Sequence, residues 1–243
     1  MLKLGSGSVK YYQRQAGEPD PFVLNLPSDY TFESGNVVAF VGSNGSGKST
    51  LLNCIAGLNE KQYHRDGIKA TWYCDNLDLD CPASAVVAYL EAHPSLLEIY
   101  SVREYMQLAE YSRKSIAANL KKMQYKSLPD QEINETIEMF DLRKVLQFST
   151  EMLSSGQKKR LGLAMILLQQ SPFIILDEPR ANLDKKGEKL LNKWINTWEK
   201  SGNIVFMATH DEKDIGLANR FFLVENKQVE KVTRDEVLKW INV

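Results

Sequence analysis

Short runs of apolar residues alternate with stretches of helical periodicity along most of this 243-residue chain. Residues 37–41, 173–176 and 204–208 have the length and the β-branched and aromatic content of buried strands. The stretch 185–199 instead repeats apolar residues at helical spacing, and the pattern returns to that of a strand over 221–224. Strands separated by helices predict a largely parallel sheet with right-handed crossovers.

Two other regions depart from this alternation. The first forty residues are typical of short strands interrupted by turns at 17–21 and 27–29, which predicts an antiparallel sheet. From residue 101 onward the pattern is helical, and Pro129 marks the start of one helix. We therefore expect a single domain over 1–243. Its core and antiparallel strands occupy 1–90 and 171–243, a helical subdomain occupies about 95–153, and a further helix spans 153–170.

Charge and hydropathy narrow the choice of partners. Lysine and arginine number 30 and aspartate and glutamate 31, so no broad cationic surface is expected and nucleic acid is not predicted as a partner. No apolar run approaches the ~18 residues of a membrane span, and the N-terminus lacks the pattern of a secretory signal. The chain is expected to be soluble and cytoplasmic.

The cysteines predict neither a disulfide framework nor a zinc site. They are odd in number, form no C-x-x-C pair and are interpreted as reduced thiols: Cys54, Cys74 and Cys81. Three aspartates crowd nearby, at 75, 78 and 80, but the glycine and the terminal glutamate of a calcium loop are missing. An exposed turn is the expectation there.

A phosphate-binding loop follows the first buried strand. The stretch 42–50 matches the pattern G-x-x-x-x-G-K-[ST], and an apolar helix is predicted directly after it. Its residues are Gly42, Ser43, Asn44, Gly45, Ser46, Gly47, Lys48, Ser49 and Thr50. Backbone N–H groups at a helix start bind phosphate; Lys48 is predicted to reach the β and γ phosphates, Ser49 to ligate Mg²⁺, and Thr50 to add a phosphate contact. A chance glycine-rich loop is the alternative, and the flanking strand and helix argue against it.

Two carboxylates end the strand over 173–176. Asp177 suits the magnesium ion and Glu178 suits the attacking water of a hydrolysis reaction. The alternative is that Glu178 pairs with a base such as Arg180. Together with the glycine loop, these residues predict a P-loop NTPase core of the α/β class, with a mainly parallel sheet, an N-terminal antiparallel β-subdomain and an inserted α-helical subdomain.

A third motif carries the resemblance to a known family. Leu153-Ser154-Ser155-Gly156-Gln157 resembles the LSGGQ signature of the ATP-binding cassette (ABC) ATPases, with Ser155 in place of the first glycine. In that family the signature binds the γ-phosphate of the ATP held by the opposite subunit. A helix N-terminus is physically suited to that role, because its N–H groups bind anions. A serine-capped surface helix is the alternative.

Further positions follow in the family's order. Residues 181–184, with Asp184, resemble the D-loop, which in the family communicates across the dimer. Thr209-His210 resembles the switch histidine, which holds the γ-phosphate and arranges the water, although a lone histidine is often structural. Tyr12, or its neighbour Tyr11, resembles the aromatic that stacks on adenine, although paired tyrosines in a strand are commonly packing residues.

One position departs from the family. No glutamine is found in the segment that resembles the Q-loop, which usually offers a glutamine to magnesium. His93 is the replacement by spacing before Pro94, and a one-residue shift would place Ala92 there instead. A neutral imidazole is a poor match for Mg²⁺, so metal sensing is expected to be altered.

The resemblance covers about residues 9–232 and implies a function. It implies a Mg²⁺-dependent ATPase that dimerises head-to-tail around two ATP molecules, as a homodimer or with a paired cassette subunit. A separate transmembrane subunit is implied, with this chain peripheral on the cytoplasmic face and transport in the direction of export. One alternative is a soluble, non-transport cassette ATPase of the iron–sulfur assembly type. Another, motivated by the missing glutamine, is a cassette with weak hydrolysis.

Overall fold

The structure is a computed structural model of the whole chain. It describes residues 1–11, 22–58, 63–66, 70–74, 77–78, 83–120 and 124–241.

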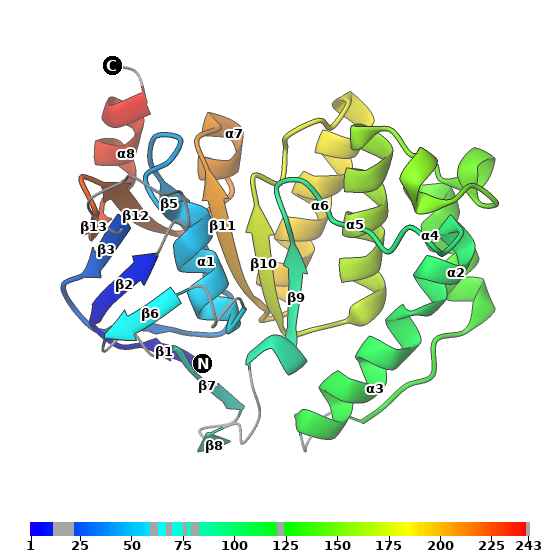
Figure 1. Cartoon of the computed structure of the whole chain (residues 1–243), viewed down its shortest axis with the longest axis horizontal. Coiled ribbons are helices and arrows are strands. Elements are labelled where there is room, and N and C mark those ends of the chain that lie inside the picture. The colour runs from blue at the N-terminus through cyan, green and yellow to red at the C-terminus, as the bar shows by residue number, and fades with distance from the viewer. Residues whose placement is uncertain are drawn as a thin grey trace, which may run out of the picture.

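A large mixed sheet forms the centre of the molecule (Figure 1). Within the described residues its strand order is β6 (Tyr63–Asp66), β2 (Gly7–Tyr11), β3 (Phe22–Leu26), β13 (Gln228–Val232), β12 (Arg220–Glu225), β5 (Val37–Val41), β11 (Ile204–Thr209), β10 (Phe173–Asp177) and β9 (Val87–Leu90). The neighbours from β12 to β9 are all parallel. Their carboxyl ends therefore lie at one edge of the sheet. The mainly parallel sheet predicted from the sequence is confirmed.

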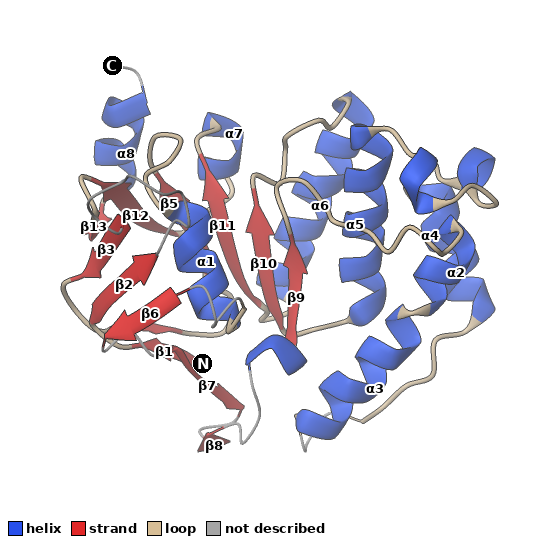
Figure 2. Ribbon diagram, viewed as in Figure 1, coloured by secondary structure: helices blue, strands red, loops and turns tan. Residues whose placement is uncertain are grey.

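Helices cover both faces of the parallel strands. As a result, every residue of β5, β10 and β11 is buried. Alternate residues face opposite layers. On one face Phe206 and Ile175 share a core with Leu51 and Leu52 of α1 (Lys48–Ala56). On the other face, Val205, Met207 and Ile174 share a core with α5 (Ser155–Gln169) and α6 (Lys185–Lys200). The two helical layers appear in blue on either side of the red strands in Figure 2.

A helical lobe packs beside the sheet through α5. It contains α2 (Val102–Gln107), α3 (Ala109–Asn119) and α4 (Asp130–Met139), all of which contact α5. Ser101 begins α2 through a capping box with Glu104, and Pro129 begins α4. Pro129 therefore begins a helix at the position that the sequence predicts. In the part of the chain that the structure describes, no helix has the length and apolarity to cross a bilayer.

The predicted antiparallel sheet is present, and it contains only some of the N-terminal strands. A small sheet has the order β4 (Tyr30–Phe32), β1 (Leu2–Leu4), β7 (Ala70–Cys74) and β8 (Leu77–Asp78), whereas β2, β3 and β6 join the large sheet. The connection runs through β13, where Asn25 N–H donates to the Lys227 carbonyl at 2.8 Å. Strands over 63–78 were not predicted, because such short segments show little periodicity. Asp78 ends β8, while Asp75 and Asp80 lie outside the described residues.

Two short helices complete the fold near the C-terminus. The helix α7 (Glu212–Ile215) follows β11, and α8 (Arg234–Ile241) packs on β12. Val237 of α8 shares a small core with Ala39 and Val41 of β5. This packing supports the strand that leads directly into the glycine loop.

Candidate nucleotide site

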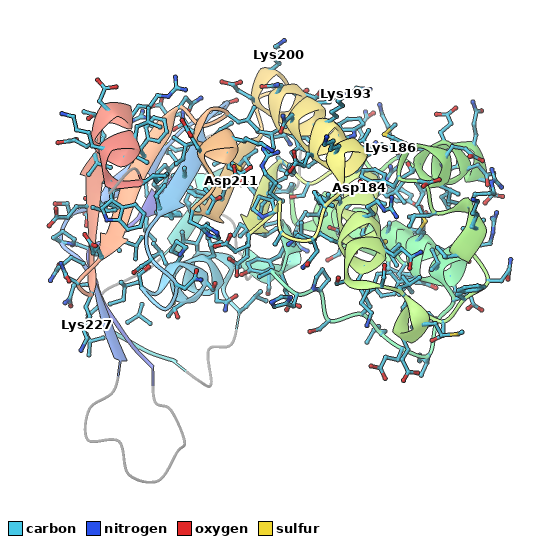
Figure 3. All side chains as sticks on the ribbon, turned by 90° about the horizontal axis from the view of Figure 1, so that it is seen from above. Asp184, Lys186, Lys193, Lys200, Asp211 and Lys227 are labelled. Atoms are coloured by element: carbon cyan, nitrogen blue, oxygen red, sulfur yellow. The ribbon has the colours of Figure 1, made fainter. Side chains whose placement is uncertain are left out.

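The predicted site residues gather at the carboxyl edge of the parallel strands. The glycine loop follows β5, Glu178 follows β10 and His210 follows β11, and these three strands are neighbours in the sheet. Figure 3 looks down on the molecule from above, with Asp184 at the start of α6 and Asp211 beside α7. Ligands of open α/β sheets bind outside the carboxyl ends of the strands.

The glycine loop has a shape that only glycine permits at two points. A Cβ atom on Gly42 would lie 2.2 Å from the carbonyl oxygen of Val224, so the loop passes too close to β12 for a side chain. Gly47 precedes α1 with φ of 107°, a left-handed conformation that side chains disfavour. The loop therefore delivers the backbone to the N-terminus of α1, where unpaired N–H groups bind anions.

The side chain of Lys48 folds back onto the first residues of this loop. Its Nζ donates to the carbonyl oxygens of Gly42 at 2.8 Å and Ser43 at 3.0 Å. Burial lowers the pKa of Lys48, while the negative charges of Glu178 and Asp177 raise it. The ammonium group is thus held where phosphate oxygens would approach. Of the remaining loop residues Ser43, Asn44, Gly45 and Ser49 are exposed, and Ser46, Gly47 and Thr50 are partly buried.

Asp177 has the properties of a metal ligand. The residue is 5% exposed, and its Oδ1 has no hydrogen-bond partner among the described residues. Burial raises the pKa of Asp177, and a hydrogen bond with Ser49 lowers it. A buried carboxylate oxygen beside a hydroxyl fits Mg²⁺, which prefers oxygen ligands. Asp177 and Ser49 are therefore the residues that would hold the ion.

Glu178 and His210 face each other across the sheet edge. His210 Nδ1 lies 3.1 Å from Glu178 Oε1, and the Glu178 N–H donates to the Ala208 carbonyl of β11 at 2.9 Å. The backbone of Glu178 has φ of 42°, which is uncommon for a non-glycine residue and typical of functional sites. Both side chains are partly open to solvent, so water can reach them.

A buried lysine lies beneath this pair. Lys159 of α5 is completely buried, and its Nζ donates to three backbone carbonyls: Glu91 at 2.9 Å, Ala92 at 3.1 Å and Asp177 at 3.0 Å. Burial lowers its pKa to about 8, against the attraction of four carboxylates led by Asp177. Lys159 therefore joins the lobe helix, the loop after β9 and the end of β10.

The signature residues form the start of α5. Ser154 Oγ accepts from the Gln157 N–H at 3.3 Å, and the Gln157 side chain accepts from the Ser154 N–H at 2.9 Å, which is a capping box. Ser155 is exposed as the first helical residue. The serine-capped helix of the alternative interpretation is thus present, and its first N–H groups remain oriented for an anion.

The signature helix also contacts the segment that resembles the D-loop. A Cβ atom on Gly156 would already lie 2.8 Å from the Asn182 carbonyl. Asp184 caps α6 by accepting from the Gly187 N–H at 2.8 Å, and its other oxygen lies 3.4 Å from Arg160 of α5. Within one chain, these two segments are therefore in direct contact.

Two predicted residues receive less support. His93 is exposed in the loop after β9, and no group of three metal-ligating side chains occurs among the residues that the structure describes. Tyr12 lies outside the described residues.

The sequence analysis missed two buried charged residues near the site, Lys159 and Asp214. The position of Lys159 beside the apolar run of α5 was the available signal, whereas nothing local marks Asp214.

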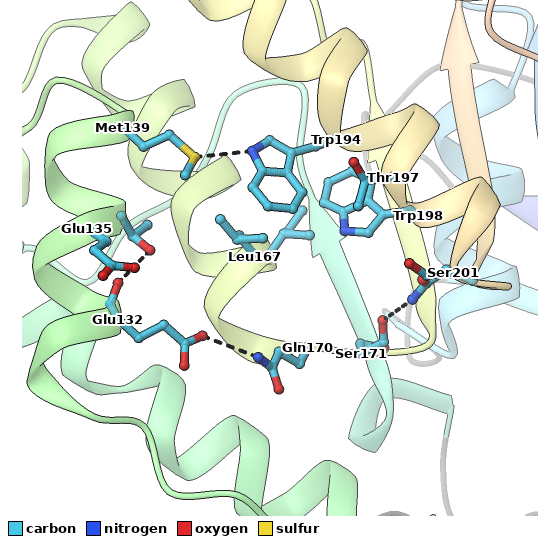
Figure 4. A pocket seen from close by; sticks show the side chains of 13 residues that line it. Glu132, Glu135, Met139, Leu167, Gln170, Ser171, Trp194, Thr197, Trp198 and Ser201 are labelled. Atoms are coloured by element: carbon cyan, nitrogen blue, oxygen red, sulfur yellow. Dashed lines mark hydrogen bonds between the residues drawn. The ribbon is translucent and has the colours of Figure 1, made fainter.

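A separate groove lies between α4, α5 and α6 (Figure 4). Its volume is about 500 Å³, and Trp194, Trp198 and Met139 line it. Trp194 Nε1 donates to Met139 Sδ at 3.3 Å, and the two tryptophan rings lie 6.3 Å apart. None of the glycine-loop residues lines this groove.

Comparisons with known proteins identify the family of this sequence. A family model described as "ABC transporter" matches residues 27–181. The tyrosine transport ATP-binding protein of Clostridioides difficile is 30% identical, with 95% of this chain and 94% of that protein covered. The vitamin B12 import ATP-binding protein BtuD of Vibrio atlanticus is 34% identical over 82% and 79%. The cytochrome c biogenesis ATP-binding export protein CcmA of Paramagnetospirillum magneticum is 30% identical over 74% and 78%.

Solved structures share the fold. An ATP-binding subunit of an ABC transporter has a TM-score of 0.75 at 23% identity, with 100% of this chain and 94% of the other covered. A dimeric ATP-binding cassette in a post-hydrolysis state, bound to ADP and phosphate, has a TM-score of 0.74 at 22% identity over 96% and 99%.

Proposed function

This chain belongs to the ABC transporter family as an ATP-binding cassette ATPase, and we propose that it binds and hydrolyses ATP to drive a separate transmembrane protein. One observation carries the proposal. Lys48, the Glu178–His210 pair and the buried carboxylate of Asp177 converge on one edge of the sheet, although they come from three different strand ends.

Each of these residues has a defined task in hydrolysis. The backbone N–H groups of the glycine loop and Lys48 bind the phosphates and neutralise the charge that develops on them. Glu178 accepts a proton from the attacking water while the water oxygen forms a bond to the γ-phosphorus. The bond between the γ-phosphorus and the oxygen that bridges to the β-phosphate breaks, and ADP is the leaving group. His210 orients that water and contacts the γ-phosphate. Ser49 and Asp177 would hold Mg²⁺, which would supply further charge neutralisation to the phosphates.

A second copy completes the site in this proposal. The exposed helix start at Ser154–Gln157 hydrogen-bonds within itself, and no hydrogen bond joins it to the glycine loop among the described residues. Two structural neighbours are dimeric cassettes. Both points support a head-to-tail dimer, in which each signature helix reaches the ATP of the other copy. ATP that binds better to the closed dimer shifts the open–closed equilibrium toward the closed state. Hydrolysis removes the ligand that holds the dimer closed, so the dimer can open again.

The surface for the membrane partner is the loop after β9. Large apolar side chains are exposed there and just before α5: Leu97 (56%), Ile99 (85%), Phe148 (44%) and Met152 (68%). Thr150 Oγ1 donates to the Leu97 carbonyl at 2.9 Å and Ser149 Oγ to the Glu98 carbonyl at 2.6 Å, so the two segments form one apolar patch. A hollow of about 240 Å³, lined by Glu91, Tyr105 and Gly162, lies on the same loop. Exposed apolar clusters of this kind mark interaction sites.

The patch supports a transport subunit on the cytoplasmic face of a membrane over a soluble, non-transport ATPase. Relatives named for import and for export match this chain at similar identity, 34% and 30%. The direction of transport therefore stays a prediction from the family resemblance of the sequence.

The experiment measures the mass of Glu178→Gln in solution, with and without ATP and magnesium, beside the ATP turnover of the unchanged chain. We expect turnover by the unchanged chain and an ATP-dependent shift of the variant from monomer to dimer. Glu178→Gln combined with Lys48→Ala is the control. This double variant should bind ATP weakly and should therefore stay monomeric. If Glu178→Gln stayed monomeric with ATP and magnesium, the shared site would be contradicted.

Ile99→Asp tests the apolar patch separately. It should abolish co-purification with an integral membrane protein and leave dimerisation intact.

A further inference from the structure

A buried arginine follows the proposed catalytic glutamate by two residues. Arg180 has a side chain that is 5% exposed, and its Nε and Nη2 lie 2.9 and 2.8 Å from Asp214 Oδ1. Nη2 also donates to Asn192 Oδ1 of α6 at 2.8 Å. Nη1 is buried without a hydrogen-bond partner among the described residues, 3.9 Å from Glu188. A guanidinium group suits this position because its donors form a rigid fork.

The other oxygen of Asp214 serves the strand that carries His210. Asp214 is completely buried, and its Oδ2 accepts from Thr209 Oγ1 at 2.8 Å. The same hydroxyl oxygen of Thr209 accepts from the Asp211 N–H at 3.0 Å. Thr209 and Asp211 are the two neighbours of His210, so these bonds hold the backbone on both sides of the imidazole.

One carboxylate therefore joins two loops. Asp214 binds Arg180, which the chain connects to Glu178 through Pro179, and it binds Thr209, which directly precedes His210. A buried, charge-assisted contact of this kind is rigid, because leaving either charge unpaired in the interior is costly.

We propose that Arg180 is a positioning residue for ATP hydrolysis: through Asp214 and Thr209 it holds His210 against Glu178. The inference rests on the proposed function, because it takes the Glu178–His210 pair as the group that orients the attacking water. Small displacements of such groups lower rates strongly, whereas nucleotide binding at the glycine loop does not involve Arg180. The link reaches α6 as well, through Asn192.

The test compares Arg180→Gln with Arg113→Gln. Arg113 is a matched control, since it is also buried at 4% exposure and pairs with a carboxylate, Glu132, but lies in the helical lobe. Both substitutions should lower the melting temperature. Only Arg180→Gln should lower kcat, by about tenfold, with the KM for ATP within about twofold. Arg180→Lys, which keeps the charge and loses the fork, should restore kcat only in part.

Two further measurements separate positioning from a general loss of stability. In a His210→Ala background, Arg180→Gln should change the remaining turnover by less than about twofold, because it acts through the residue already removed. The chain has three histidines, so the ring NMR signals of His210 can be assigned from the spectrum of His210→Ala. Those signals should move in Arg180→Gln, while those of His93 stay in place.

The outcomes are distinct. An unchanged kcat, an unmoved His210 signal, or an equal loss of turnover with and without His210 would overturn the positioning role. If His210→Ala alone left turnover intact, the proposed function of the pair would fail instead, and a moved His210 signal in Arg180→Gln would still report the link.

Discussion

Glu178 and His210 are 32 residues apart in the chain, yet His210 Nδ1 lies 3.1 Å from both carboxylate oxygens of Glu178. The contact arises because β10 and β11 are parallel neighbours, with Asp177 paired to Ala208 in register. Each residue is the first after its strand, so the two side chains meet at the sheet edge. A carboxylate and an imidazole at this distance can share a proton and hold a water between them and a substrate.

His210→Ala should reduce ATP turnover by about 100-fold, because the group that orients the water with Glu178 is lost. The affinity for ATP should change less than turnover, since His210 supplies one γ-phosphate contact whereas the glycine loop and Lys48, which bind the phosphates in this proposal, stay in place. Steady-state turnover and nucleotide titration provide the two numbers. Glu178→Gln should reduce turnover much less in the His210→Ala variant than in the unchanged chain, because the two residues act on the same water. Fully multiplicative losses would show that they act independently.

Asp177→Asn should stabilise the protein without ligand and abolish its magnesium-dependent turnover. The carboxylate is buried and one of its oxygens lacks a hydrogen-bond partner among the described residues, so its charge is costly to bury in the absence of a cation. We expect the free energy of unfolding to rise by about 1 kcal/mol, as is common when a functional residue that costs stability is replaced. Urea unfolding measures it.

Asp184→Asn is the matched control for this change. Asp184 is an exposed helix cap, and asparagine caps a helix as well as aspartate does, so stability should stay nearly constant. If Asp177→Asn were less stable than the unchanged chain, the buried carboxylate would have to be satisfied in the folded protein, and its assignment as a metal ligand would be wrong.

Lys159 should make stability depend on alkaline pH. Burial lowers its pKa from 10.5 to about 8 in the folded protein. Between these values the unfolded chain binds more protons than the folded one, so the free energy of unfolding rises with pH in that window. Below pH 8 the buried charge weakens the fold, and above 10.5 that penalty is gone. The full effect amounts to about 3 kcal/mol.

The measurement is the difference in unfolding free energy between the unchanged chain and Lys159→Met, from pH 7 to 11. This difference should rise by the equivalent of one proton across the window. Lys186→Met serves as the reference, because Lys186 is exposed on α6 (Figure 3) and its substitution should give a flat difference. A flat difference for Lys159→Met as well would mean that the ammonium group titrates normally despite its three carbonyl partners.

Local motifs could be predicted from the sequence because their physics is local. The phosphate contacts proposed for the glycine loop are made by consecutive backbone N–H groups, so Gly42 to Thr50 and the flanking strand and helix suffice to predict it. The cap at Ser154 and Gln157 is likewise a contact over three residues. The strands at 37–41, 173–177 and 204–209 were placed to within one residue, because buried runs of this kind have a strong pattern.

The amino-acid pattern alone was therefore enough to predict the fold class, the nucleotide loop and the candidates Asp177, Glu178 and His210. Which of these residues meet depends on the three-dimensional fold, because the order β5–β11–β10 places residues distant in the chain at one edge. It also joined β2 and β3 to the large sheet through β13, and it buried Lys159 and the Arg180–Asp214 pair. Such contacts depend on pairing between distant strands and on packing of the lobe against the sheet, and neither leaves a periodic signal in the residues involved.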